Sequence, residues 1–143
     1  MYAFESFYCR VVKIAITGLR AAAAGLGLQF LKHLSRTGLL LHLVDVAPYE
    51  SMDTAVEAAR KIIHEVEKWS DDLAHKPRWL VLNKTDRLPY DEADDICQAI
   101  VDELEWTGPV FKIAAINGKG TRDLMFAIMN FLEEERRNKS EQE

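Results

Sequence analysis

The sequence has few of the residues that would place it in a specialised class of protein. It holds only two cysteines in 143 residues. Cys9 and Cys97 are far apart and match no metal-binding or redox spacing, which favours a reducing, cytoplasmic setting. The most apolar window, residues 11–28, is interrupted by Lys13 and Arg20. A membrane span is therefore not expected.

Positive charge is also scarce. The chain carries 18 lysines and arginines against 23 acidic residues, a formal net charge of −5. This balance argues against a broad basic surface for sequence-specific DNA binding. Hydrophobic residues make up 48% and charged residues 29% of the chain, as in a soluble globular protein. The length suits a single domain with its own core.

Short apolar runs alternate with segments of helical periodicity. The runs predict four strands, at residues 11–17, 39–46, 79–82 and 110–115. Apolar spacings of three and four predict four helices, at residues 28–36, 52–69, 89–104 and 121–132. The alternation predicts an α/β fold of three layers, with about four parallel strands and helices on both faces. We assign one domain to residues 1–132, leave residues 1–9 without an element, and expect a charged tail over 133–143.

The sequence also predicts which residues begin the helices and which residues form the buried face of the last helix. Ser51 and Thr121 are candidate N-caps, and Pro89 suits a first helical turn. The buried face of the last helix is predicted to hold a stripe of apolar residues, namely Leu124, Met125, Ile128, Met129 and Leu132.

The segment W-L-V-L-N-K-T-D, residues 79–86, carries the strongest functional signal. Its apolar half predicts a buried strand that delivers Asn83, Lys84 and Asp86 to its carboxyl end, where open α/β sheets bind ligands. The pattern N-K-x-D is typical of guanine-binding sites. A plain polar turn is the alternative, since Asn and Asp favour turns for local reasons.

Each residue of the motif has a chemical part in a guanine site. A carboxylate at Asp86 accepts hydrogen bonds from both N1–H and the exocyclic amine, a forked pair that adenine cannot form. Asn83 ties the loop to its neighbours and reaches the N7 side of the base. The stem of Lys84 covers the face of the base and the sugar. A backbone N–H near Ala115, after the next strand, meets the guanine O6.

Two segments, residues 25–48 and 76–86, resemble the Obg family of GTPases, and the similarity runs from about Ile14 to Leu132. The resemblance implies a parent protein of the cytoplasm that binds and hydrolyses GTP with Mg²⁺ and acts in assembly of the large ribosomal subunit and in stress control. It also implies a set of guanine-binding residues, namely Asn83, Lys84, Thr85, Asp86, Ala114, Ala115 and Ile116.

The chain departs from the family pattern where the phosphates are bound. It has no G-x-x-x-x-G-K-[ST] loop, and its one Gly-Lys pair, Gly118-Lys119, is followed by Gly120. The switch II motif D-x-P-G corresponds to Ala15-Ile16-Thr17-Gly18, so the aspartate beside the magnesium is an alanine. The serine of the family's S-A-A is Ala114. We therefore expect no catalytic or metal-binding residue, weak nucleotide binding and no autonomous GTP hydrolysis.

The missing phosphate-loop strand also affects the sheet. In GTPases of this type that strand lies between the counterparts of residues 11–17 and 39–46, so here these two strands must close up or leave open edges. Three interpretations remain open. The chain is the C-terminal half of an Obg-type G domain that reads guanine, or a non-catalytic module that binds a ribosome or protein partner. The third is a non-functional remnant of a split gene, which the anomalous residues 1–24 favour.

Overall fold

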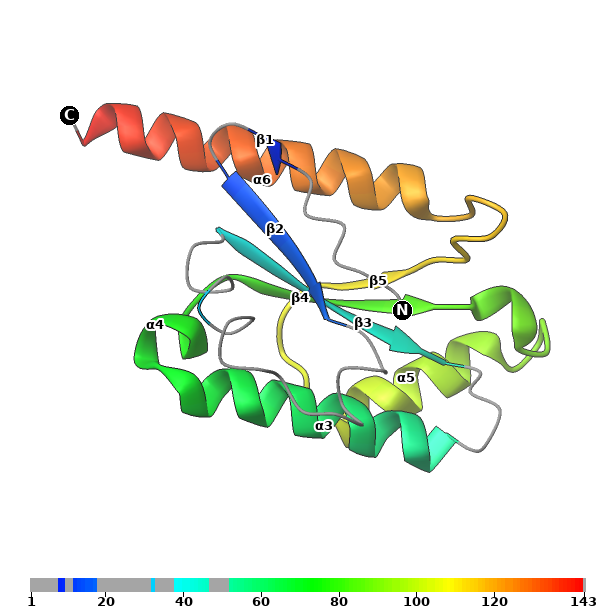
Figure 1. Cartoon of the computed structure of the whole chain (residues 1–143). Coiled ribbons are helices and arrows are strands. Elements are labelled where there is room, and N and C mark those ends of the chain that lie inside the picture. Colours follow the sequence, from blue (N-terminus) through cyan, green and yellow to red (C-terminus); the bar gives the residue numbers. More distant parts are fainter. Residues whose placement is uncertain (1–7, 10–11, 18–31, 33–37, 47–51, 143) are drawn as a thin grey trace.

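A five-stranded sheet runs through the computed structural model (Figure 1), which describes residues 8–9, 12–17, 32, 38–46 and 52–142. Its strands lie in the order β1-β2-β3-β4-β5. Their bounds are β1 Tyr8–Cys9, β2 Val12–Thr17, β3 Leu39–Asp45, β4 Arg78–Asn83 and β5 Val110–Lys112. β2 to β5 are parallel, whereas β1 pairs with β2 in the antiparallel sense. The four predicted parallel strands are confirmed, and β1 is an addition in the segment that had no assignment.

The two strands between which the resemblance would place a phosphate-loop strand pair directly with each other. Ile14 lies opposite Leu39, and the register continues to Thr17 opposite His42. No strand lies between β2 and β3 in the described sheet. Of the two possibilities that the sequence left open, this part of the chain therefore takes the first and closes up.

Helices cover both faces of the sheet, as predicted (Figure 1). One face carries α3 (Met52–Trp69) and α5 (Ala93–Glu103), with the short α4 (Asp71–Ala74) after α3, and the other face carries α6 (Thr121–Glu141). The position of β4 between the two helical layers explains why its sequence is continuously apolar. Leu80 and Leu82 belong to the buried cluster of α3 and α5, while Trp79 and Val81 belong to the cluster of α6. Alternate side chains of a strand point to opposite faces, so a strand with helices on both faces is apolar throughout.

Several predicted element ends were wrong. α5 begins at Ala93, so Pro89 lies in the loop before it, after a 3₁₀ turn, η1, over Thr85–Arg87. Gly120, with φ of 77°, is the N-cap of α6, and Thr121 is its first residue. The Thr121 hydroxyl donates a hydrogen bond of 2.6 Å to the Gly118 carbonyl, which makes it part of the turn rather than the cap.

Two further differences concern β5 and α4. β5 ends at Lys112 rather than near residue 115, because Ala114 turns away and forms an isolated bridge with Lys119. α4 was missed, although its signal is present in the sequence. The Ser70 hydroxyl accepts a hydrogen bond of 3.2 Å from the N–H of Leu73, an ordinary N-cap.

The buried face of α6 was only partly predicted. Leu124 and Ile128 are buried, and Leu132 is half-buried. Met125 and Met129, however, are 56% and 54% exposed, so their assignment to the core was wrong. Ala127 and Phe131, which were not predicted, are partly buried against the same cluster as Leu132. Trp79 fixes this rotation of the helix, because its ring packs edge-on against Phe131 with centroids 5.6 Å apart.

Other predictions fall outside the described residues. The predicted helix over 28–36 is described only at Lys32, and Gly18 and Ser51 are not described.

α6 continues to Glu141, so most of the charged C-terminal segment is helical and exposed. None of the helices in the described ranges has the length and hydropathy needed to cross a bilayer.

Acid is expected to destabilise the fold through His42. This side chain is 2% exposed in β3 and meets the Trp106 ring edge-on, with centroids 5.6 Å apart. Burial, with a smaller contribution from the charge of Arg78, lowers the pKa of His42 from 6.5 to about 3. The unfolded chain therefore binds the proton first as pH falls through about 6.5, so the free energy of unfolding falls with pH.

The His42 contribution should amount to about 1 kcal/mol between about pH 7 and 5.5, measured by urea unfolding. His42→Leu should remove this part of the pH dependence. His64→Gln is the matched control, because His64 is exposed on α3. If the free energy of unfolding depends on pH equally in the wild type and in His42→Leu, His42 is not the source of this pH dependence.

Candidate functional site

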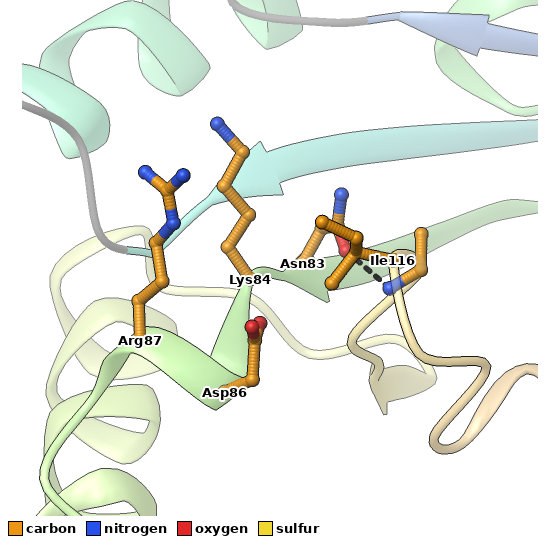
Figure 2. A pocket seen from close by; sticks show the side chains of 6 residues that line it. Asn83, Lys84, Asp86, Arg87 and Ile116 are labelled. Atoms are coloured by element: carbon orange, nitrogen blue, oxygen red, sulfur yellow. Dashed lines mark hydrogen bonds between the residues drawn. The ribbon is translucent and has the colours of Figure 1, made fainter.

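The predicted site lies at the carboxyl edge of the sheet, where two loops meet (Figure 2). One loop follows Asn83, the last residue of β4, and contains Lys84 to Arg87; the other follows β5 and contains Ala114 to Lys119. Thr85 joins them, because its N–H and its hydroxyl both donate to the Ile113 carbonyl, at 3.3 and 3.1 Å. Thr85 therefore holds the site together, and its hydroxyl is engaged within the protein.

A hollow of about 100 Å³ opens between the two loops. Six residues line it, namely Asn83, Lys84, Asp86, Arg87, Ala115 and Ile116. Five of these belong to the predicted set, and Arg87 was not predicted. Clefts for drug-sized ligands occupy about 300–1,000 Å³. A hollow of this size suits one part of a ligand, such as a flat ring, rather than a whole nucleotide.

Asn83 ends β4 and links the loops through its side chain. Its Oδ1 accepts a hydrogen bond of 3.1 Å from the N–H of Ala115 (Figure 2). The side-chain nitrogen points away from this bond and is available as a donor to a ligand (Figure 2). The structure thus brings Asn83 and Ala115 together, but the Ala115 N–H that was expected to face a ligand oxygen is engaged by Asn83. Among the described residues, the next N–H, that of Ile116, donates no hydrogen bond.

Lys84 adopts the left-handed conformation, with φ of 66°. Its Nζ forms an ion pair of 2.5 Å with Asp45, the last residue of β3. The sequence did not predict this pair. The signal was present, however, because parallel pairing places Asp45 opposite Asn83. The stem of Lys84 consequently runs across the edge of the sheet from β4 towards β3 (Figure 2).

Asp86 supplies the carboxylate of the hollow. It lies in η1, and its side chain is exposed. Figure 2 shows its oxygens on the side of the loop that carries the Lys84 and Asn83 side chains. The Asp86 carboxylate makes no ion pair or hydrogen bond to another residue in the described part of the chain. Both oxygens are therefore available as acceptors beside the hollow.

The remaining predicted residues lie in the loop after β5 and in β2. Ala114 is fully buried, and its N–H donates a hydrogen bond of 2.9 Å to the Lys119 carbonyl, whereas Ile116 is 87% exposed at the rim. Ala15 to Thr17 lie within β2. Within the described ranges, no group of three His, Cys, Asp or Glu side chains is arranged to hold a metal ion.

The link between Asn83 and Ala115 can be tested apart from any ligand. Asn83→Ala removes the acceptor of the Ala115 N–H, and we expect hydrogen exchange at Ala115 to accelerate about fivefold, since one hydrogen bond contributes about 1 kcal/mol. Asn83→Asp keeps an acceptor oxygen and should preserve the protection of Ala115. Unchanged exchange in Asn83→Ala would show that the loops are held together without this bond.

Comparison with solved structures finds chains of similar fold. No family model matches the sequence. The chain is similar to the structure of a putative nucleolar GTP-binding protein 1 from Plasmodium falciparum, with 13% sequence identity and a TM-score of 0.49. The similarity covers 80% of this chain and 59% of that protein, so the chain spans less than two thirds of its length. The identity of the ligand therefore rests on the geometry of the site itself.

Proposed function

We propose that this chain is a guanine-recognition module related to the Obg-type G domain, which binds the base of GTP or GDP in the hollow at Asn83–Arg87. The observation that carries the proposal is the free carboxylate of Asp86 beside a hollow of about 100 Å³ whose opposite wall is held by the bond from Ala115 to Asn83.

The chemistry of Asp86 favours guanine over adenine. Its two oxygens match the adjacent N1–H and amine donors of guanine in a charge-assisted pair. Adenine places an acceptor nitrogen at N1, so a carboxylate there would lose its partners and face a lone pair. A site discriminates strongly against a ligand that leaves one of its buried polar groups without a hydrogen-bond partner. Asp86 is exposed before binding, so the selectivity arises as the base covers it.

Asn83 and the β5 loop make the remaining contacts to the base. Not every one of these contacts distinguishes guanine from adenine. The Asn83 amide donates to N7, which both purines possess, so this contact orients the base. The guanine O6 accepts from the Ile116 N–H, or from the Ala115 N–H after it leaves Asn83. Lys84 packs its stem beside the base while its ammonium stays with Asp45.

The module is proposed to bind without hydrolysing GTP. Phosphoryl transfer depends on groups that hold the phosphates and the metal. The chain has no G-x-x-x-x-G-K-[ST] segment, and Ala15 stands where the family pattern has aspartate. In the described ranges, no three His, Cys, Asp or Glu side chains are grouped so that they could hold a metal ion. On the resemblance alone, we also propose the cytoplasm as its location and the large ribosomal subunit as a partner.

A titration with fluorescently labelled GDP and ADP tests the proposal. We expect saturable binding of GDP, at least about tenfold tighter than binding of ADP. Asp86→Ala should bring the two affinities together. Equal binding of both nucleotides by the wild type, or an Asp86→Ala variant that keeps the preference, would overturn the guanine site.

A further inference from the structure

The outer side of α6 carries three large apolar side chains that are more than half exposed. Met125, Phe126 and Met129 are 56%, 60% and 54% exposed. Figure 1 shows α6 as the labelled helix on its side of the sheet, opposite α3 and α5. Met125 and Phe126 lie four and three residues before Met129, so both are its neighbours on one side of the helix. Large apolar side chains gathered on one stripe mark a contact surface more strongly than single exposed residues do.

Opposite charges flank this apolar stripe. Arg122 lies one turn before Phe126, and Glu133 lies one turn after Met129, on the same side of the helix. Both side chains are exposed. Over residues 122–133, this side of the helix therefore has a positive end, an apolar middle and a negative end, and Arg136 and Arg137 follow beyond it. We call the five residues Arg122, Met125, Phe126, Met129 and Glu133 the α6 stripe.

We propose that the α6 stripe binds a second copy of this chain, with the two α6 helices antiparallel. In that arrangement, with the twofold axis between residues 127 and 128, each Arg122 lies opposite the Glu133 of the second copy. Phe126 then lies opposite Met129, a contact of thioether and ring that is favourable. A parallel pair would place like charges together at both ends. The pattern of the stripe is thus complementary to itself in one orientation only.

The contact is of modest size and strength. The Glu133 side chain already meets Arg137 of its own helix at 4.0 Å, an exposed pair that contributes only a few tenths of a kcal/mol. A single pair of helices buries less than the roughly 1,200–2,000 Å² of a stable interface. We therefore expect a dimer that forms and dissociates with concentration, in the micromolar range or above.

Charge reversal tests this arrangement, with sedimentation velocity over a concentration series as the measurement. Arg122→Glu and Glu133→Arg should each raise the dimer dissociation constant at least about tenfold, because each places like charges at both ends of the contact. An equimolar mixture of the two variants should associate like the wild type. In the mixed dimer one copy has an acidic side chain at both ends of its stripe and the other has a basic one, so opposite charges meet again. The double variant should also recover.

Glu134→Arg is the matched control. It makes the same charge change at an exposed neighbour that lies off the stripe, and it should leave the dimer intact. A wild-type chain that stays monomeric at millimolar concentration would overturn the proposal. So would association that is indifferent to both reversals, because it would show a contact through another surface such as an edge strand.

Discussion

Replacing Asp86 by asparagine is expected to move the preference of the site from guanine to xanthine. An amide offers one acceptor and one donor where the carboxylate offers two acceptors. Xanthine presents N1–H beside a carbonyl at C2, so it pairs with the amide, whereas the guanine amine would face an N–H. The ratio of guanosine to xanthosine affinity should change by at least about a hundredfold, since one matched contact is lost and another is gained.

Competition binding measures this change, with unlabelled guanosine and xanthosine diphosphates displacing a labelled nucleotide. Asp91→Asn is the matched control, because it makes the same substitution at an exposed aspartate outside the hollow and should leave the ratio unchanged. If Asp86→Asn lowers the affinity for both nucleotides equally, Asp86 stabilises the loop but does not distinguish one base from the other.

Replacing Gly120 by alanine is expected to cost about 3 kcal/mol or more of stability. A Cβ built at Gly120 would lie 2.3 Å from the Lys112 carbonyl oxygen, and φ is +77°. The obstacle is backbone of β5 and cannot rotate aside, so β5 and the start of α6 must separate. The loss should appear as a lower urea midpoint, and binding at the neighbouring β5 loop should weaken with it.

Gly118→Ala is the comparison that isolates the clash. Gly118 has nearly the same φ, +78°, but a Cβ there would meet only the Thr121 hydroxyl, at 3.8 Å. Its cost should be limited to the left-handed conformation, about 1 kcal/mol. Equal losses in the two variants would show that the close approach of Gly120 to β5 contributes nothing.

The strands and the site position were predictable because both depend on local patterns. The apolar run before Asn83 required a strand buried on both faces, and parallel strands bring their carboxyl ends to one edge. The pairing of β2 with β3 followed less directly. The resemblance to the Obg family implied that a strand would be missing, but only the register of Ile14 with Leu39 shows that β2 and β3 pair directly.

The features that could not be predicted depend on orientation between elements. Met125 and Met129 share the apolar period of α6 with Leu124 and Ile128, so the sequence alone does not tell which side meets the sheet. The packing of Phe131 on Trp79 decides it. Similarly, Asn83 was expected to tie the loop to its neighbours, but its partner Ala115 was not predicted, because no residue spacing determines how closely two loops approach.

The central claim is that the hollow beside Asp86 binds guanine as a base, and nuclear magnetic resonance tests it most directly. Guanosine added to the ¹⁵N-labelled chain should shift the amide signals of Lys84, Ala115 and Ile116 and the side-chain amide of Asn83, and adenosine at the same concentration should not. Equal shifts with both nucleosides, or shifts that avoid these four groups, would contradict guanine recognition at this site.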